Sequence, residues 1–117
     1  MADARQGEQD TGASVSQPEE FERAAELLRA LSHPVRLRII ELLGSGELCV
    51  KNLEEHLGVS QSSVSQHLTR LRYAGLIESE RKGHLVCYRL RRGAASKILE
   101  AAIDESRKDN QGRSGTS

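Results

Sequence analysis

The sequence predicts a small, mainly helical domain that carries one β-hairpin. Apolar residues recur at three- and four-residue spacing in several segments, which is the period of an amphipathic helix. Two short alternating segments flank a glycine near position 83, as expected of a hairpin. Of the 117 residues, 37% are hydrophobic and only 3% aromatic, enough for one modest core built from Leu, Ile, Val and Ala.

The first predicted helix runs from Pro18 to about Leu31. Proline in the first turn, followed by Glu19 and Glu20, is typical of a helix N-terminus, because acidic side chains there face the positive end of the helix dipole. We expect its apolar residues to form one buried stripe: Phe21, Ala24, Ala25, Leu28 and Leu31.

The second predicted helix follows a break at residues 32–34. Ser32 is the expected N-cap, and Pro34 lies in the first turn. The core face of this helix consists of Val35, Ile39, Leu42 and Leu43. The Gly-Ser-Gly sequence at 44–46 ends it.

Two further helices are expected on either side of a tight turn. One covers about Val50–Leu57 and ends at Gly58, and the other covers about Gln61–Ala74 with Ser60 as its N-cap. This is the outline of a helix-turn-helix. The inward positions of the second helix are Val64, Leu68 and Leu71. Its opposite face starts with amide and hydroxyl side chains: Gln61, Ser62, Ser65 and Gln66.

A hairpin and a last helix complete the predicted fold. The strands are expected over Leu76–Glu80 and Leu85–Leu90, joined by the turn 81–84. The last helix is expected over Ala94–Lys108. Its apolar stripe, which needs another surface to be buried, consists of Ala95, Ile98, Leu99, Ala102 and Ile103.

The folded unit is therefore expected to be one domain over residues 18–108. Residues 1–17 and 109–117 are polar, rich in Gly and Ser and without apolar periodicity, so we expect both to be disordered tails. No apolar run approaches the ~18 residues that span a bilayer, and the N-terminus lacks the apolar core of a signal peptide. We expect a cytoplasmic protein with no membrane partner.

Basic residues are concentrated in one segment, although the formal net charge of the chain is zero. Residues 1–66 hold 6 basic and 11 acidic side chains, whereas residues 67–92 hold 7 basic and 2 acidic ones. A basic segment beside a helix-turn-helix is typical of a surface that contacts DNA phosphates. The alternative interpretation is an ordinary solvated face.

The polar start of the helix after Ser60 is the predicted reader of DNA bases. The major groove admits one helix, where Gln61 and Gln66 can each pair with adenine through two hydrogen bonds. The turn 81–84 would reach a neighbouring minor groove or phosphates. The predicted DNA-binding residues are Ser60, Gln61, Ser62, Ser63, Ser65, Gln66, His67, Arg70, Arg81, Lys82 and His84. The alternative is an ordinary polar helix start.

Three stretches together resemble the ArsR/SmtB family of small bacterial winged-helix regulators: LRALSHPVRLRIIELL (28–43), ELCVKNLEEHLGVSQSSVSQHLTRLRYAGLI (47–77) and RKGHLVCYRL (81–90). The resemblance implies a winged helix-turn-helix with about five helices and a two-stranded wing, homodimeric through its first and last helices. It also implies a sequence-specific repressor of transcription, which binds a pseudo-palindromic operator in double-stranded DNA and releases it when an inducer binds.

The metal-binding motifs of that family are incomplete in this chain. Where the family's soft-metal motif E-L-C-V-C has its second cysteine, this chain has Lys51, and one thiolate cannot build such a site. The positions of the family's last-helix motif, Asp, His, His and Glu, correspond here to Arg92, Ala94, Glu105 and Lys108. No cofactor is therefore implied, and a divalent metal ion such as nickel or zinc would need a non-standard site.

Cys49 and Cys87 are the candidate sensor thiols. Cys49 falls at a predicted helix N-terminus, which lowers the pKa of a thiol, so it is a candidate reactive thiolate; the alternative is a half-buried small apolar residue. Cys87 is expected on the other strand face from Val86 and Tyr88, as a second exposed thiol. Because the hairpin and the helix are different parts of the domain, we expect reduced cysteines rather than an intramolecular disulfide. The inducer would be a thiol-reactive species or a metal ion.

Two other classes of function compete with this prediction. The chain could be a winged helix without an inducer that contacts proteins. It could also be a small enzyme, but the sequence shows no Ser/His/Asp arrangement, no paired acids in an apolar setting and no glycine-rich phosphate loop. We therefore predict a regulator and not an enzyme.

Overall fold

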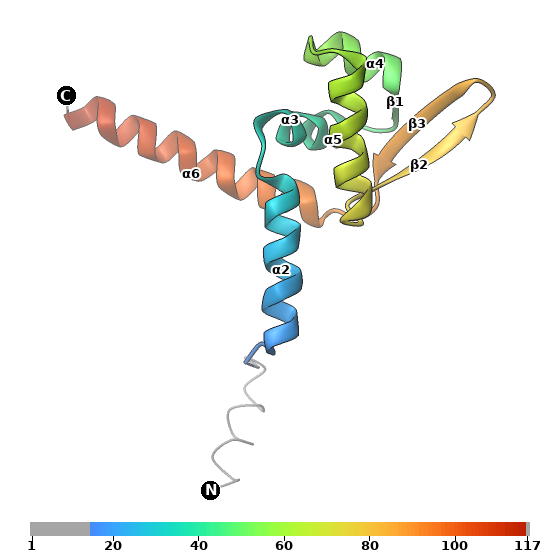
Figure 1. The fold of residues 1–117 in the computed structure, drawn as a ribbon. Coiled ribbons are helices and arrows are strands. Elements are labelled where there is room, and N and C mark those ends of the chain that lie inside the picture. Colours follow the sequence, from blue (N-terminus) through green and yellow to red (C-terminus); the bar gives the residue numbers. More distant parts are fainter. Residues whose placement is uncertain (1–14, 117) are drawn as a thin grey trace, which may run out of the picture.

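The computed structural model describes residues 15–116, and describes side chains as far as residue 110. Most of the predicted N-terminal tail lies outside the described residues. The described chain forms five helices and three strands (Figure 1). In order they are α2 (Pro18–Leu31), α3 (Pro34–Leu43), β1 (Leu48–Cys49), α4 (Val50–Leu57), α5 (Gln61–Tyr73), β2 (Ile77–Lys82), β3 (Leu85–Leu90) and α6 (Ala94–Thr116). The predicted fold, a mainly helical winged helix-turn-helix, is confirmed.

The wing is a long antiparallel hairpin of β2 and β3 that projects from the helices (Figure 1). Lys82 and Leu85 are paired, so Gly83 and His84 alone close the hairpin. Gly83 has a φ of +67°, which suits the first position of a two-residue type II′ turn and is strained for other residues. The turn is therefore shorter than the predicted 81–84, and Arg81 lies on β2.

A third strand, β1, was not predicted. It pairs with the edge of β3 that β2 leaves free, giving the strand order β1-β3-β2. Leu48 lies opposite Tyr88, and Cys49 lies opposite Cys87. A strand of two residues is too short to show the alternation that identifies strands in a sequence.

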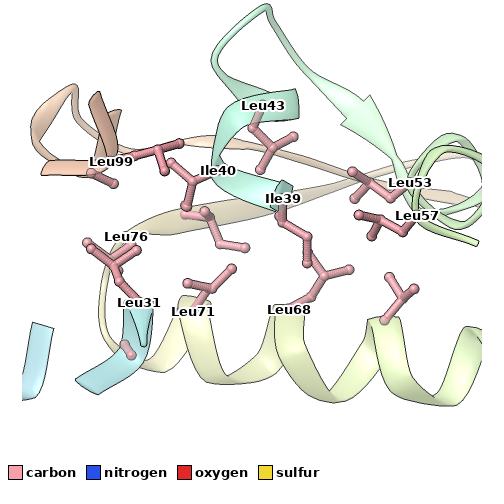
Figure 2. Packing of buried hydrophobic residues seen from close by; sticks show 14 residues of the cluster. Leu31, Ile39, Ile40, Leu43, Leu53, Leu57, Leu68, Leu71, Leu76 and Leu99 are labelled. Carbon is pink, nitrogen blue, oxygen red and sulfur yellow. The ribbon is translucent and has the colours of Figure 1, made fainter. Parts of the chain in front are cut away.

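The core lies mainly between α3 and α5 (Figure 2). Leu68 and Leu71 of α5 point toward α3, and side chains from the other elements close the ends of the cluster. The labelled residues of this buried cluster are Leu31, Ile39, Ile40, Leu43, Leu53, Leu57, Leu68, Leu71, Leu76 and Leu99. Fully burying one such side chain contributes about 1.5–3 kcal/mol. The core therefore holds α5 firmly against α3.

The N-cap of α3 is His33, and the predicted cap, Ser32, instead follows the last residue of α2. The Nδ1 atom of His33 accepts a hydrogen bond from the amide of Val35 at 3.1 Å. An imidazole nitrogen thus replaces the hydroxyl oxygen that usually fills this role.

Helix α6 continues to Thr116 instead of ending near Lys108. The segment from residue 109, which we expected to be a disordered tail, extends the helix in the structure. An ion pair between Lys108 and Asp104, with its atoms 3.4 Å apart, lies one turn earlier and favours helical continuation.

The apolar stripe of α2 is only partly buried within one chain. Leu31 is buried, but Phe21 and Leu28 are 63% and 53% exposed. α6 shows the same pattern, because Leu99 is buried whereas Ile103 is 38% exposed. The prediction of a buried α2 stripe is wrong for the single chain, since α2 and α6 both extend away from the core (Figure 1).

Candidate nucleic-acid interface

The helix-turn-helix consists of α4, a short turn and α5. α4 ends at Gly58, whose φ of +66° is a left-handed conformation that glycine adopts without strain. The hydroxyl oxygen of Ser60 accepts a hydrogen bond from the amide of Ser63 at 3.1 Å, so the predicted N-cap of α5 is confirmed. Such a cap contributes about 1 kcal/mol and determines where the helix begins.

The first two turns of α5 present a polar face to solvent. The exposed side chains are Gln61, Ser62, Ser65 and Gln66, and Ser60 before them is exposed too. Ser63 is half-buried, and Val64 is fully buried on the core side. The predicted division of α5 into an inner apolar face and an outer polar face is confirmed, whereas the contacts of these residues with DNA stay a prediction.

The side chain of His67 is half-buried and contacts the start of α3. Its ring centroid lies 4.3 Å from that of His33, with the ring planes tilted by 46°. Burial lowers the pKa of His67, and the nearby charges of His33 and Arg36 lower it further. The structure therefore gives this half-buried imidazole a place in the contact between α5 and α3, and its predicted contact with DNA stays a prediction.

Arg70 joins α5 to α2. Its Nη2 atom lies 2.8 Å from Oε2 of Glu26. The hydrogen bond from Arg70 is the main cause that lowers the pKa of the Glu26 carboxyl. The guanidinium that we predicted to contact DNA is thus engaged within the chain, where it helps to orient α5.

The wing carries three of the predicted DNA-binding residues. Arg81 and His84 are exposed near the tip of the hairpin. The Nζ atom of Lys82 lies 2.6 Å from Oε2 of Glu47, which precedes β1. The hydrogen bond with Glu47, followed by the charge of Glu47, raises the pKa of Lys82. Glu47 therefore competes with DNA phosphates for this ammonium group.

Arg89 forms ion pairs with three carboxylates. Its guanidinium nitrogens lie 3.7 Å from Glu47, 3.5 Å from Glu78 and 3.1 Å from Glu80. The partners on β2 follow from the hairpin register, but Glu47 is distant in sequence and only the pairing of β1 with β3 brings it here. The role of Glu47 could therefore not be predicted from the sequence.

Comparison with known proteins identifies the family. The family described as "Bacterial regulatory protein, arsR family" matches residues 33–79. The Biofilm growth-associated repressor of Xylella fastidiosa is 40% identical over 77 residues, which make up 66% of this chain and 68% of that protein. The HTH-type transcriptional regulator YgaV of Escherichia coli is 42% identical over 79 residues, 67% of this chain and 80% of that protein. The chain belongs to the ArsR family.

The solved structures agree with this assignment. HlyU from Vibrio cholerae superimposes with a TM-score of 0.68 at 32% identity, covering 74% of this ArsR-family chain and 94% of HlyU. Members of the ArsR family are DNA-binding transcriptional regulators. The prediction of a regulator of this family, and not an enzyme, is confirmed.

The two cysteines of this ArsR-family chain are joined by a disulfide bond. Cys49, the half-buried N-cap residue of α4, and Cys87, on β3, lie opposite each other in the sheet. The expectation of separate, reduced thiols is wrong because β1 places the start of α4 beside the wing. The expectation that Cys87 is exposed is also wrong, since it is only 2% exposed.

Two other features, a metal cluster and a membrane span, are absent from the described residues. In the part of the ArsR-family chain that the structure describes, no group of three or more His, Cys, Asp or Glu side chains is placed to hold a metal ion. Among the described helices, none is both long and apolar enough to cross a membrane.

Proposed function

We propose that this ArsR-family protein is a cytoplasmic repressor that binds a pseudo-palindromic operator as a homodimer. In each subunit, the polar face of α5 lies in the major groove and the wing lies beside it. The observation that carries the proposal is the exposure of Gln61 and Gln66 on a helix whose start is capped by Ser60 and whose inner face is locked in the core. Amide side chains on a rigid helix can read adenine, whereas mobile ones lose binding energy to ordering.

Exposed apolar side chains support the homodimer. Phe21 and Leu28 on α2, and Ile103 on α6, are large and solvent-exposed in the single chain. Such residues at helical spacing favour contact with another apolar surface. A second copy of the chain offers the same surfaces, and its two-fold symmetry would place two α5 helices on two half-sites about one DNA turn apart.

Repression, rather than activation, is supported by the relatives. The relative from Xylella fastidiosa is named a biofilm growth-associated repressor, and a relative in Mycobacterium tuberculosis is named the HTH-type transcriptional repressor SmtB. A repressor of this kind occupies DNA until a signal lowers its affinity.

We propose that the signal acts on the pair Cys49 and Cys87. The bond between them joins the N-cap residue of α4, just before the helix-turn-helix, to the wing, so its formation or cleavage acts on both DNA-binding elements. A peroxide would supply the chemistry: the two thiols lose two electrons and two protons, an S–S bond forms, and hydrogen peroxide is reduced to two molecules of water. A solved structure of the similar protein HlyU from Vibrio cholerae is named as its reduced form. This name supports the proposal that the signal is a change of redox state.

A gel-shift titration on the DNA upstream of the protein's own gene tests the DNA-binding part. We expect the double variant Gln61→Ala/Gln66→Ala to lose operator binding by 100-fold or more, estimated from about 1–3 kcal/mol for each two-bond contact with a base. Size-exclusion chromatography should show an unchanged dimer. The control variant Arg23→Ala, on α2 and exposed, should bind as the wild type does. Equal operator binding by the double variant would refute the assigned reader.

The same titration tests the signal. Wild-type protein is compared in its reduced state and after treatment with hydrogen peroxide, beside the variant Cys49→Ser/Cys87→Ala. We expect the affinity of the wild type, and not of the double variant, to depend on the treatment. Equal responses of the two proteins would refute the cysteine pair as the sensor.

A further inference from the structure

We propose that Arg38 is a positioning residue that sets the angle at which the reader helix α5 leaves the turn of the helix-turn-helix. Arg38 lies on α3, outside the helix-turn-helix, and was not among the predicted DNA-binding residues. Its Nη2 atom donates a hydrogen bond to the carbonyl oxygen of His56 at 3.1 Å. Its Nη1 atom donates another to the carbonyl oxygen of Leu57 at 3.4 Å. One guanidinium therefore binds the last two residues of α4.

These two carbonyls are groups that a helix leaves without a partner. The last four carbonyl groups of any helix lack an intrahelical donor. α4 has only eight residues, so its C-terminal end is a large part of it. A cation at that end also faces the negative end of the helix dipole. Arg38 thus satisfies the end of α4 with charge-assisted hydrogen bonds, which are stronger than those between neutral groups.

The position of α4's end determines where α5 starts. Only Gly58 and Val59 lie between Leu57 and Ser60, the N-cap of α5. Gly58 is the most flexible residue type, and its amide hydrogen bond to the carbonyl oxygen of Glu54 stays within the end of α4. The hydrogen bonds from Arg38 attach that end of α4 to α3. A shift of the turn would move Gln61, the first residue of the reader.

The backbone of Arg38 is itself firmly placed. The next two residues, Ile39 and Ile40, are fully buried and point from α3 into the core that contains Leu68 of α5 (Figure 2). Arg38 therefore links the body of the domain to the turn, while the core links the body to the middle of α5. One helix, α3, therefore contacts both the end of α4, which lies just before the reader helix, and the middle of the reader helix itself.

A direct contact with a DNA phosphate is the competing role for an exposed arginine. The two roles differ in what they predict. A phosphate contact contributes to binding of every DNA sequence and to its salt dependence. A positioning residue affects the alignment of Gln61 with its base, so it acts on the operator and leaves the number of phosphate contacts unchanged. The proposal rests on the proposed function, in which α5 reads the operator.

The test compares Arg38→Met and Arg38→Lys with Arg23→Met, an exposed arginine of α2 that serves as the matched control. Affinity for the operator and for DNA of unrelated sequence is measured at several salt concentrations. For Arg38→Met we expect about a tenfold loss of operator affinity, with unchanged affinity for unrelated DNA and an unchanged salt slope. Arg38→Lys, which keeps the charge but not the planar fork, should lose less. Arg23→Met should resemble the wild type.

Three results would overturn the proposal. Equal loss on both DNAs, with a salt slope reduced by about 2, that is about 1 for each subunit of the dimer, would show a phosphate contact. No loss on either DNA would show that Arg38 has no role in reading. Amide hydrogen exchange supplies a readout that needs no DNA. Relative to the wild type, Arg38→Met should exchange faster at the end of α4 and in the first turn of α5, and not in α2. The same change of exchange rate in all three helices would refute the proposed link. If the wild type does not prefer its operator, the proposed function fails, while the exchange result still decides the role of Arg38.

Discussion

Reduction of the disulfide between Cys49 and Cys87 is expected to lower the free energy of unfolding by about 4 kcal/mol. The two residues are separated by 38 positions, and the crosslink removes the conformational freedom of that loop from the unfolded chain. The entropy that a crosslink removes from the unfolded chain grows with the logarithm of the loop length, and a loop of 38 residues corresponds to about 4 kcal/mol at 25 °C. For a domain of roughly 100 residues, a loss of this size lowers Tm by roughly 15–30 °C.

The assay is thermal and urea unfolding followed by circular dichroism at 222 nm. The oxidised protein is compared with protein reduced by a phosphine, at one fixed protomer concentration because dimers unfold in a concentration-dependent way. The control is Cys49→Ser/Cys87→Ala, in which serine suits the N-cap of α4 and alanine suits the buried strand position. This variant should unfold like the reduced wild type and should not respond to the reductant.

Two results would refute this reasoning. One is an unchanged midpoint after reduction, which would mean that the crosslink does not restrict the unfolded chain. The other is titration of two free thiols in the folded protein under oxidising conditions, which would mean that β1 does not hold Cys49 against Cys87.

Two further predictions concern charge. Burial, aided by His33 and Arg36, lowers the pKa of His67 below its ordinary value of 6.5, so the unfolded chain takes up a proton first as the pH falls. Stability should therefore decrease as the pH drops through about 6.5, and His67→Gln should remove part of that decrease in urea unfolding at pH 5 to 8; an identical pH profile for the variant would contradict this. Glu47→Gln should release Lys82 for phosphates, raising operator affinity about threefold with a steeper salt dependence. Unchanged affinity and salt slope in the same titration would show that Glu47 does not compete with DNA.

Local signals in the sequence were sufficient for most of the helices. Pro18, Gly58 and Ser60 act on the backbone within a turn of their own positions, so the start of α2, the end of α4 and the start of α5 could be predicted from neighbouring residues. Helical spacing also separated the inner face of α5 from the polar face that we assign to DNA. His33 shows the limit of such signals, because two adjacent residues could each cap α3 and the geometry of the break decided between them.

The features that could not be predicted are contacts between residues that are distant in sequence. Cys87 was expected to be an exposed thiol, since strand alternation assigns it to a face but does not reveal what covers that face. The helices α3 and α4, which lie against β3, cover it, and the pairing of β1 with β3 brings Glu47 to Lys82. Likewise, the ion pair of Arg70 with Glu26 depends on how α2 lies against α5.

The sequence by itself determined the family, the order of the helices and the hairpin, and the polar face of the reader helix, because these depend on residue types and on spacing within one element. Only the tertiary structure decided that the two cysteines are bonded, that two of the predicted DNA contacts are held by carboxylates, and that Arg38 reaches the end of α4. The physical reason is that each of these contacts joins separate elements, and its energy arises only after the core has brought those elements together.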